Sequence, residues 1–202
     1  LVLDLRYNSG GSGTLNDPLL YALGVDAYRG FSSEKRESEL YKMQLSSISS
    51  AETETDSVSV SVSTASKDSV YRIRANEVAE ITKRFQGKVY CVIGDWTYSS
   101  ANLFATIVKD NKLFTVVGEP TKQKPSHFGE VLFLRLPNTL IVCRMSCKQF
   151  HRPDKSKDAD ETLYPDVSIF RSFDDVRKGV DPVYDWIIGD IGKSVSAKSE
   201  TK

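Results

Sequence analysis

Apolar residues gather in short runs along the chain, and the spacing of these runs predicts an α/β fold. Residues 88–94 (KVYCVIG) and 113–118 (LFTVVG) are short, apolar and rich in β-branched side chains, which is typical of buried strands. Between them, residues 100–110 (SANLFATIVKD) repeat apolar side chains at helical spacing. A strand, a helix and a strand within about 30 residues predict a parallel βαβ unit.

The first residues predict a further strand that ends in a glycine-rich loop. Residues 1–6 (LVLDLR) form an apolar run interrupted by Asp4 and Arg6, and residues 7–13 (YNSGGSG) follow it. Glycines in such a loop tolerate positive φ and close approach of another backbone. We expect Asp4 and Arg6 to pair and to hold the glycine-rich loop in shape.

The remaining pattern predicts a hairpin and several helices. Residues 130–136 (EVLFLRL) and 139–147 (TLIVCRMSC) flank a Pro-Asn pair, which predicts an antiparallel hairpin. Residues 16–28 begin with a cap and a proline, which predicts a helix packed on the first strand. Residues 75–85 predict an amphipathic helix, and residues 172–188 predict one or two helices.

The pattern is weak in two segments, and they set the predicted domain limits. Residues 32–69 are dominated by serine, threonine and charge, so we expect an insertion in which valines at 58–62 could form one edge strand or hairpin. Residues 192–202 are expected to be a disordered tail. The prediction is one domain over 1–191. Because residue 1 stands inside a strand, an N-terminal part is expected to be missing.

Composition excludes several classes of function. Lys and Arg number 27, as do Asp and Glu, so the formal net charge is zero and nucleic acid is not an expected partner. The apolar runs are shorter than the roughly 18 residues that span a bilayer, and no signal peptide is recognisable, so a soluble chain is expected.

The cysteines predict neither a disulfide nor a metal site. Cys143 and Cys147 lie on the same face of a predicted strand, about 13 Å apart at 3.3 Å per residue, and no CxxC motif or Cys/His cluster is present. We therefore expect Cys91, Cys143 and Cys147 to be buried free thiols, and we expect no metal and no other cofactor.

Two adjacent serines mark the first candidate for chemistry. Ser99 and Ser100 lie where the strand at 88–94 gives way to the helix at 100–110. A hydroxyl at this junction can cap the helix, while the first backbone N–H groups point at whatever lies in front of it. One interpretation is therefore a simple helix cap, and the other is a nucleophile, which needs a base and an oxyanion hole.

Both of these partners can lie near the serines. Parallel strands bring their carboxyl ends to the same edge of a sheet, so the loop at 118–130 (GEPTKQKPSHFGE), with Lys124 and His127, can meet the serines. The glycine-rich loop lies at that edge too if its strand is a parallel neighbour. Its backbone N–H groups, with that of Ser100, could then form an oxyanion hole.

Three segments in this order, LVLDLRYNSGG, TYSSAN and VVGEPT, resemble the signature segments of the C-terminal processing peptidases, the tail-specific serine proteases of family S41. The resemblance covers most of the chain except the insertion. The closing YPDVSIFRSFDDVRKGVDPVYDWI is similar to the end of bacterial members. The resemblance implies a ClpP/crotonase-like α/β domain with parallel βαβ units and an antiparallel hairpin.

The resemblance also implies roles for individual residues. The family motif around the nucleophile is Thr, any residue, Ser, two small residues and an acidic or amide residue, so TYSSAN implies Ser99 as the nucleophile. The oxyanion donors that it implies are the amides of Ser100 and of Gly10 or Gly11. Asn102 occupies the acidic or amide position of the motif.

The base that the resemblance implies is Lys124, which follows Thr121 by three residues and Ser99 by 25. A lysine acts as a base at neutral pH only where burial or nearby positive charge lowers its pKa. Some similar proteins carry a PxHxG segment here without a well-placed lysine, and these imply His127 as the alternative base.

The resemblance thus implies a serine endopeptidase of the C-terminal processing type, which cleaves polypeptides through an acyl-enzyme outside the cytoplasm. A rival from another class is an inactive S41-like module that holds a peptide or a hydrophobic ligand in the former cleft. Asn102 and the unusual segment at 122–125 (KQKP) favour this rival. The sequence gives no oligomeric state.

Overall fold

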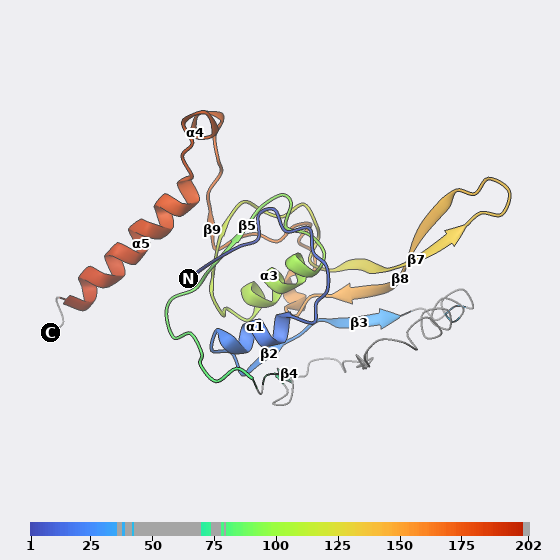
Figure 1. Cartoon of the computed structure of the whole chain (residues 1–202), viewed down its shortest axis with the longest axis horizontal. Coiled ribbons are helices and arrows are strands. Elements are labelled where there is room, and N and C mark those ends of the chain that lie inside the picture. Colours follow the sequence, from blue (N-terminus) through green and yellow to red (C-terminus); the bar gives the residue numbers. More distant parts are fainter. Residues whose placement is uncertain (36–37, 39–41, 43–69, 74–77, 79, 200–202) are drawn as a thin grey trace.

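A parallel sheet forms the centre of the computed structural model, which describes residues 1–35, 38, 42, 70–73, 78 and 80–199 (Figure 1). The strand order is β1-β5-β6-β9, with bounds β1 (Val2–Asp4), β5 (Tyr90–Ile93), β6 (Thr115–Gly118) and β9 (Val167–Ser168). Every pairing is parallel, with Leu3 opposite Cys91 and Cys91 opposite Val116. The predicted βαβ unit is confirmed, and so is the parallel placement of the first strand.

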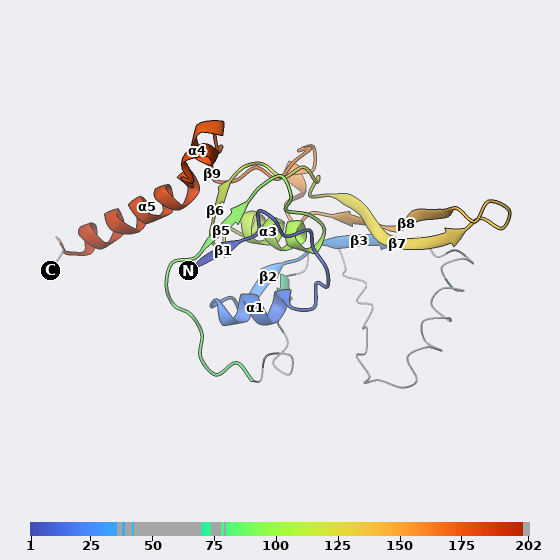
Figure 2. The same cartoon turned by 45° about the horizontal axis from the view of Figure 1, so that its top comes forward.

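One face of this sheet is covered by α3 (Ser100–Asp110) and α1 (Asn16–Ala22) (Figure 2). Phe104 and Val108 of α3 pack with Leu20 of α1 and with Cys91 of β5 in one buried cluster. Because β5 is buried on both faces, it is apolar at every position rather than at alternate ones.

The other face of the sheet is covered by the start of α5 (Pro182–Ser199), where Val183 and Ile187 pack on Tyr90 and Val92. Beyond this contact the helix runs away from the sheet (Figure 1). A shorter helix, α4 (Phe173–Lys178), precedes it and begins at a capping box between Ser172 and Asp175. The pattern at 172–188 therefore forms two helices.

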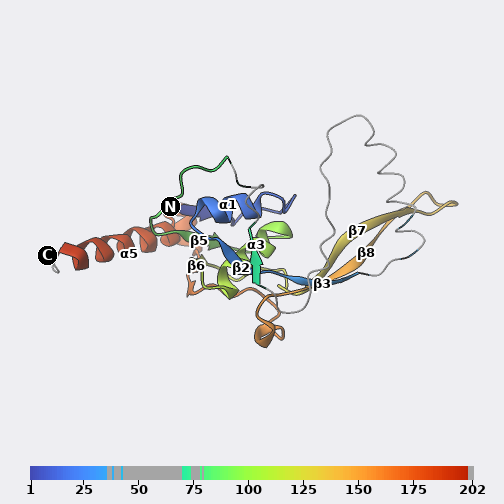
Figure 3. The ribbon, with the colours of Figure 1, turned by 90° about the horizontal axis from the view of Figure 1, so that it is seen from below.

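Two antiparallel sheets flank this centre. The first pairs β2 (Ala27–Arg29) with β4 (Val70–Arg72), and the second has the order β3-β8-β7, with β3 (Ser32–Lys35), β7 (His127–Arg135) and β8 (Val142–His151). The predicted hairpin is confirmed, with Leu132 opposite Met145, and it projects from the centre of the fold (Figure 3). A short 3-10 helix, η2 (Lys155–Lys157), follows it. The strand or hairpin predicted at 58–62 lies outside the described residues.

The prediction of a helix over 75–85 is wrong for the part that the structure describes. Residues 81–86 have no regular secondary structure, and two of them bond to the end of α1. The Phe85 N–H donates to the Ala22 carbonyl at 2.7 Å, and Arg84 Nε donates to the Tyr21 carbonyl at 2.8 Å. The helix predicted over 16–28 is also shorter than expected, since Gly24 leaves the helical region at φ 92°.

The C-terminal segment and the cysteines complete the comparison with the sequence. Helix α5 continues to Ser199, so residues 192–199 are helical where a disordered tail was expected. The segment lacks proline, so it can continue a helix that has already formed. No described helix is long and apolar enough to cross a bilayer. Cys91, Cys143 and Cys147 are free thiols, although Cys143 is only partly buried.

Candidate active site

Ser99 lies in the tight turn between β5 and α3, with φ 52° and ψ −126°. Positive φ in a residue with a side chain costs about 1–3 kcal/mol and persists only where the surroundings enforce it. Ser99 occupies the N-cap position, but its side chain makes no capping hydrogen bond to the helix. The geometry therefore gives no support to a capping role for its hydroxyl, and nucleophilic serines of α/β hydrolases occupy a strained strand-to-helix turn of this kind.

The glycine-rich loop packs directly against this turn. Gly10 has φ 98°, and a Cβ atom added there would lie 2.6 Å from Ser99 Cβ and 2.9 Å from the Ser100 nitrogen. The Tyr98 N–H donates to the Asn8 carbonyl at 3.0 Å, which ties the two segments together. The Gly10 N–H is engaged by Asn8 Oδ1 at 2.9 Å. The structure thus brings Gly10 to Ser99 and Ser100, with the Gly10 N–H already bonded.

Arg6 anchors the start of the glycine-rich loop. It pairs with Asp4 at 2.7 Å, as predicted from the sequence, and also with Asp181 next to α5 at 2.7 Å. Tyr184 of α5 donates to Asp4 at 3.3 Å. Burial alone would raise the pKa of Asp4, but its hydrogen bonds with Arg6 outweigh that effect and the pKa is lowered. The loop is therefore linked to the C-terminal helix as well as to β5.

A hollow of about 430 Å³ opens beside this loop, lined by Asp4, Tyr7, Asn8 and Ser9. Three large aromatic side chains near the turn are exposed: Tyr7, Trp96 and Tyr98. Since they are exposed, they do not serve as core packing.

Gln123 contacts the candidate nucleophile, and sequence reasoning missed it. Its Oε1 accepts the backbone N–H of Ser99 at 2.5 Å. Its carbonyl accepts from Asn102 Nδ2 at 3.2 Å and from Thr121 Oγ1 at 3.0 Å. The only feature of the sequence that pointed to Gln123 was its position next to Lys124. The family pattern assigned a role to Lys124 and none to Gln123.

Asn102 lies in the first turn of α3 and is fully buried. Its Nδ2 donates to Gln123, while its Oδ1 finds no hydrogen-bond partner among the described residues. A buried acceptor without a donor is costly. An acceptor is therefore left open next to the segment that carries Gln123 and Lys124.

The two candidate bases bond elsewhere. Lys124 Nζ pairs with Glu161 Oε1 at 3.1 Å, and the Lys124 side chain is 35% exposed. His127 Nδ1 lies 2.9 Å from the Pro125 carbonyl oxygen, and the His127 ring stacks on Phe150 with centroids 5.4 Å apart. Among the residues that the structure describes, neither the Lys124 nor the His127 side chain is hydrogen-bonded to Ser99. The structure thus brings the loop to Ser99 through Gln123, and not through either predicted base.

Arg152, whose side chain is buried, connects the Lys124 loop to the end of α3. The Arg152 side chain is 2% exposed, and it pairs with Asp110 at the end of α3 at 2.7 Å. The Arg152 N–H donates to Ser126 Oγ at 2.9 Å, and Ser126 in turn donates to Asp158. Arg152 therefore joins the end of β8, the end of α3 and the loop that begins at Thr121.

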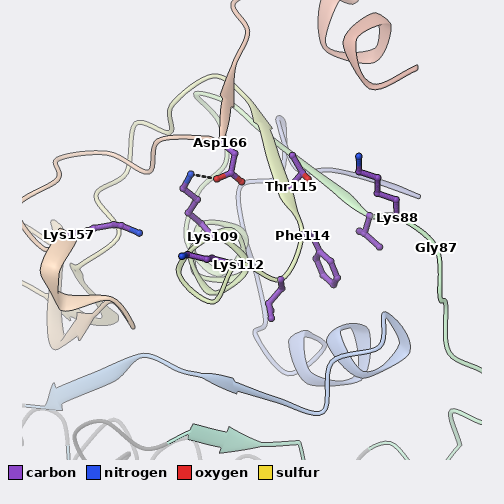
Figure 4. Close-up of a pocket in the computed structure, with 10 residues that line it drawn as sticks. Gly87, Lys88, Lys109, Lys112, Phe114, Thr115, Lys157 and Asp166 are labelled. Carbon is purple, nitrogen blue, oxygen red and sulfur yellow. Dashed lines mark hydrogen bonds and ion pairs between the residues drawn. The ribbon is translucent and has the colours of Figure 1, made fainter. Parts of the chain in front are cut away.

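A second pocket lies at the opposite edge of the sheet, near the end of α3 (Figure 4). It measures about 620 Å³, and four lysines and Asp166 contribute to its lining. Lys109 pairs with Asp166, as the dashed line in Figure 4 shows. Because Ser99 stands at the start of α3, this pocket is not part of the site. Within the described ranges, no group of three or more His, Cys, Asp or Glu side chains could hold a metal.

Comparison with known proteins bears on both fold and family. The model of peptidase family S41 matches residues 1–169. No curated protein matches the chain.

Solved structures with a similar fold include a candidate peptidase from Parabacteroides merdae ATCC 43184, with 19% identity over 94% of this chain and 50% of that chain, at a TM-score of 0.62. Mature CPAF complexed with lactacystin is 13% identical over 100% of this chain and 45% of its own, at a TM-score of 0.64. The chain thus spans about half the length of the structures it matches. The predicted ClpP/crotonase-like α/β fold, with its parallel unit and antiparallel hairpin, is confirmed.

Proposed function

Because the chain belongs to peptidase family S41, we propose that it hydrolyses peptide bonds as a serine endopeptidase with Ser99 as its nucleophile. The observation that carries this proposal is the strained turn at Ser99, which has positive φ, no side-chain cap and a glycine packed against it. With ψ −126°, Ser99 also lies outside the left-handed helical region that turns commonly use, and residues held in such sparsely populated conformations cluster at active sites.

The reaction would be acyl transfer. Ser99 Oγ attacks the substrate carbonyl carbon, a base accepts the hydroxyl proton, and the leaving amine takes a proton before water hydrolyses the acyl-enzyme. The oxyanion would face the N–H groups of Ser100 and Gly11. The bond between the Gly10 N–H and Asn8 favours Gly11 over Gly10 as the second donor, and gives Gly10 the role of close packing.

Lys124 remains the proposed base, with His127 as the alternative. Lys124 would have to leave Glu161, and the open Asn102 Oδ1 offers its Nζ an acceptor on the Ser99 side of the loop. An amide oxygen carries no charge, so it orients the amine without favouring the ammonium form as a carboxylate would. This suits a base, because only the neutral amine accepts a proton.

The substrate class would be polypeptide, and the processing of chain ends outside the cytoplasm is part of the proposal. The exposed aromatic side chains of Tyr7, Trp96 and Tyr98 beside the turn offer apolar contact to an extended chain. The hollow beside the glycine-rich loop is a place for side chains that flank the scissile bond.

Cleavage of casein by the full-length protein tests the proposal. Ser99→Ala should abolish turnover, and Ser100→Ala should only weaken it because its backbone amide is retained. Loss of turnover with Lys124→Ala and its survival with His127→Ala assign the base to Lys124, and the reverse assigns it to His127. Casein cleavage that survives Ser99→Ala would refute Ser99 as the nucleophile.

The alternative function is an inactive S41-like module that binds a peptide or a hydrophobic ligand. The ion pair of Lys124 with Glu161 favours it, since a base held by a carboxylate does not serve Ser99. A fluorophosphonate probe separates the two functions. Labelling at Ser99 supports the peptidase, while an unlabelled protein that still binds peptides supports the module.

A further inference from the structure

We propose that Gln123 is a positioning residue that fixes the backbone of Ser99 for reaction. The inference rests on the proposed function and adds a residue to which the sequence pattern assigned no role. It is carried by the hydrogen bond from the Ser99 N–H to Gln123 Oε1, which joins two segments 24 residues apart.

Gln123 is well placed to act as a fixed point because its own backbone is held. Its carbonyl accepts from two buried side chains, Asn102 on α3 and Thr121 on the preceding loop. The Thr121 N–H donates to the Leu163 carbonyl at 3.2 Å, and Thr121 Oγ1 accepts from the Leu163 N–H at 3.3 Å. Because the backbone of Gln123 is already fixed, only its side chain loses conformational freedom when it binds Ser99.

The strain at Ser99 makes such a hold necessary. With φ 52°, the turn relaxes unless neighbouring groups oppose the change. The Ser99 carbonyl is fixed by the Leu103 N–H at 2.9 Å, as the first turn of α3 requires. Gln123 fixes the other side of the same residue, so both peptide groups of Ser99 have defined directions.

The contact also decides which amides can face the oxyanion. The Ser99 N–H already donates to Gln123 and the Gly10 N–H to Asn8, so neither is free for the oxyanion. The Ser100 N–H, at the first position of α3, keeps the orientation that its helix gives it. By holding the Ser99 N–H, Gln123 leaves the N–H of the next residue, Ser100, as the amide of this turn that can face the oxyanion.

A neutral amide suits this position better than a carboxylate does. A carboxylate at 123 would accept the same N–H, but its negative charge would oppose the developing oxyanion. It would also compete with Asn102 and Glu161 for the Lys124 ammonium. The amide supplies the hydrogen bond without either effect.

The test compares Gln123→Met, which keeps length and removes the acceptor, with Gln123→Glu, which keeps an acceptor. Gln86→Met is the matched control, because Gln86 is exposed and outside the site. In the full-length protein, we measure the rate of fluorophosphonate labelling at Ser99, and kcat and KM on casein. Gln123→Met should slow labelling and lower kcat about tenfold with KM unchanged, as expected for a lost hydrogen bond to a reacting residue. Gln123→Glu should restore part of the labelling rate.

The outcomes separate this inference from the proposed function. If the wild type labels and Gln123→Met labels at the same rate, the positioning role is wrong although the peptidase stands. If the wild type neither labels nor cleaves, the proposed function fails. Hydrogen exchange of the Ser99 amide then tests the contact with Gln123 independently of activity. Fast exchange in the wild type that is unchanged in Gln123→Met would contradict the contact. Protection in the wild type that is lost in Gln123→Met would support it.

Discussion

The two sides of the candidate site are held by different kinds of contact. On the Ser99 side, the glycine-rich loop meets the turn through its backbone: the Tyr98 N–H bonds to the Asn8 carbonyl, and Gly10 packs against Ser99. On the Lys124 side, the loop is joined to distant segments through a side chain of its own, since Ser126 Oγ accepts the Arg152 backbone N–H and donates to Asp158. Neighbouring strands thus position the Ser99 side, while the Lys124 side depends on a polar network beneath it.

Each side also has its own arginine, and the two differ in burial. Arg6 is 17% exposed, and its partners Asp4 and Asp181 are 30% and 26% exposed. Arg152 is 2% exposed, and the Asp110 side chain is 0% exposed. Water can replace part of what Arg6 provides but little of what Arg152 provides. The Lys124 side should therefore be the more sensitive of the two to loss of its arginine.

The largest expected effect is that of Arg152→Met, which leaves the Asp110 carboxylate buried without its partner. We expect a loss of about 3–5 kcal/mol in the free energy of unfolding, measured by urea denaturation. The double variant Arg152→Met with Asp110→Leu should recover much of this loss, because the buried carboxylate is removed and the remaining partner of Arg152, Asp160, is 36% exposed. A loss below about 1 kcal/mol for Arg152→Met would contradict the buried network.

On the Ser99 side of the site, the largest effect is expected for Gly10→Ala. The added Cβ would lie 2.6 Å from Ser99 Cβ and 2.8 Å from the Tyr98 carbonyl oxygen, at φ 98°. Overpacking and positive φ together predict a loss of about 3 kcal/mol in the free energy of unfolding, and slower labelling of Ser99 by a fluorophosphonate. Gly11→Ala is the matched control, since nothing lies within 4 Å of its Cβ and only backbone strain applies. Equal losses in the two variants would show that close packing at Gly10 is unimportant.

The same contrast explains what could be predicted from sequence. Strands β1, β5 and β6, helix α3 and the junction at Ser99 were predicted because local pattern and strand order place them, and the hairpin followed from its Pro-Asn turn. The short strands β2, β3, β4 and β9 were not predicted, since β2 lies in the segment predicted as a helix and β3 in the segment predicted as an insertion. The contact of Gln123 with Ser99 was missed, because it depends on how two loops meet in space. The helix predicted over 75–85 is wrong for its described residues, of which Arg84 and Phe85 form hydrogen bonds to α1 that a periodic pattern does not reveal.

A smaller effect on the free energy of unfolding is expected at low pH. The hydrogen bonds of Ser156 and the charge of Lys157 lower the pKa of Asp154 to about 2, from 3.8. Since the folded-state pKa is the lower one, Asp154 contributes stability that is complete above about pH 4 and is lost as the pH falls toward 2. Asp154→Asn should therefore flatten the acid limb of stability against pH in that window.

The measurement is the urea midpoint of unfolding from pH 6 to pH 2. Asp174→Asn, which removes an exposed carboxylate on α4, is the matched control and should leave the acid limb unchanged. An unchanged acid limb in Asp154→Asn as well would mean that the contacts of Asp154 with Ser156 and Lys157 do not persist in solution.

The smallest expected effect on stability is that of Lys124→Met, and it bears most directly on the role of this lysine. Glu161 is 83% exposed, so the ion pair should contribute less than about 0.5 kcal/mol to the free energy of unfolding. Lys122→Met is the matched control, since Lys122 forms a similar exposed pair with Asp95 at 2.6 Å. If Lys124→Met matches this control in stability but alone loses casein cleavage, Lys124 acts in the reaction and not in the fold. A loss of stability well above that of the control would instead assign Lys124 to the network that holds its loop, and would leave His127 as the candidate base.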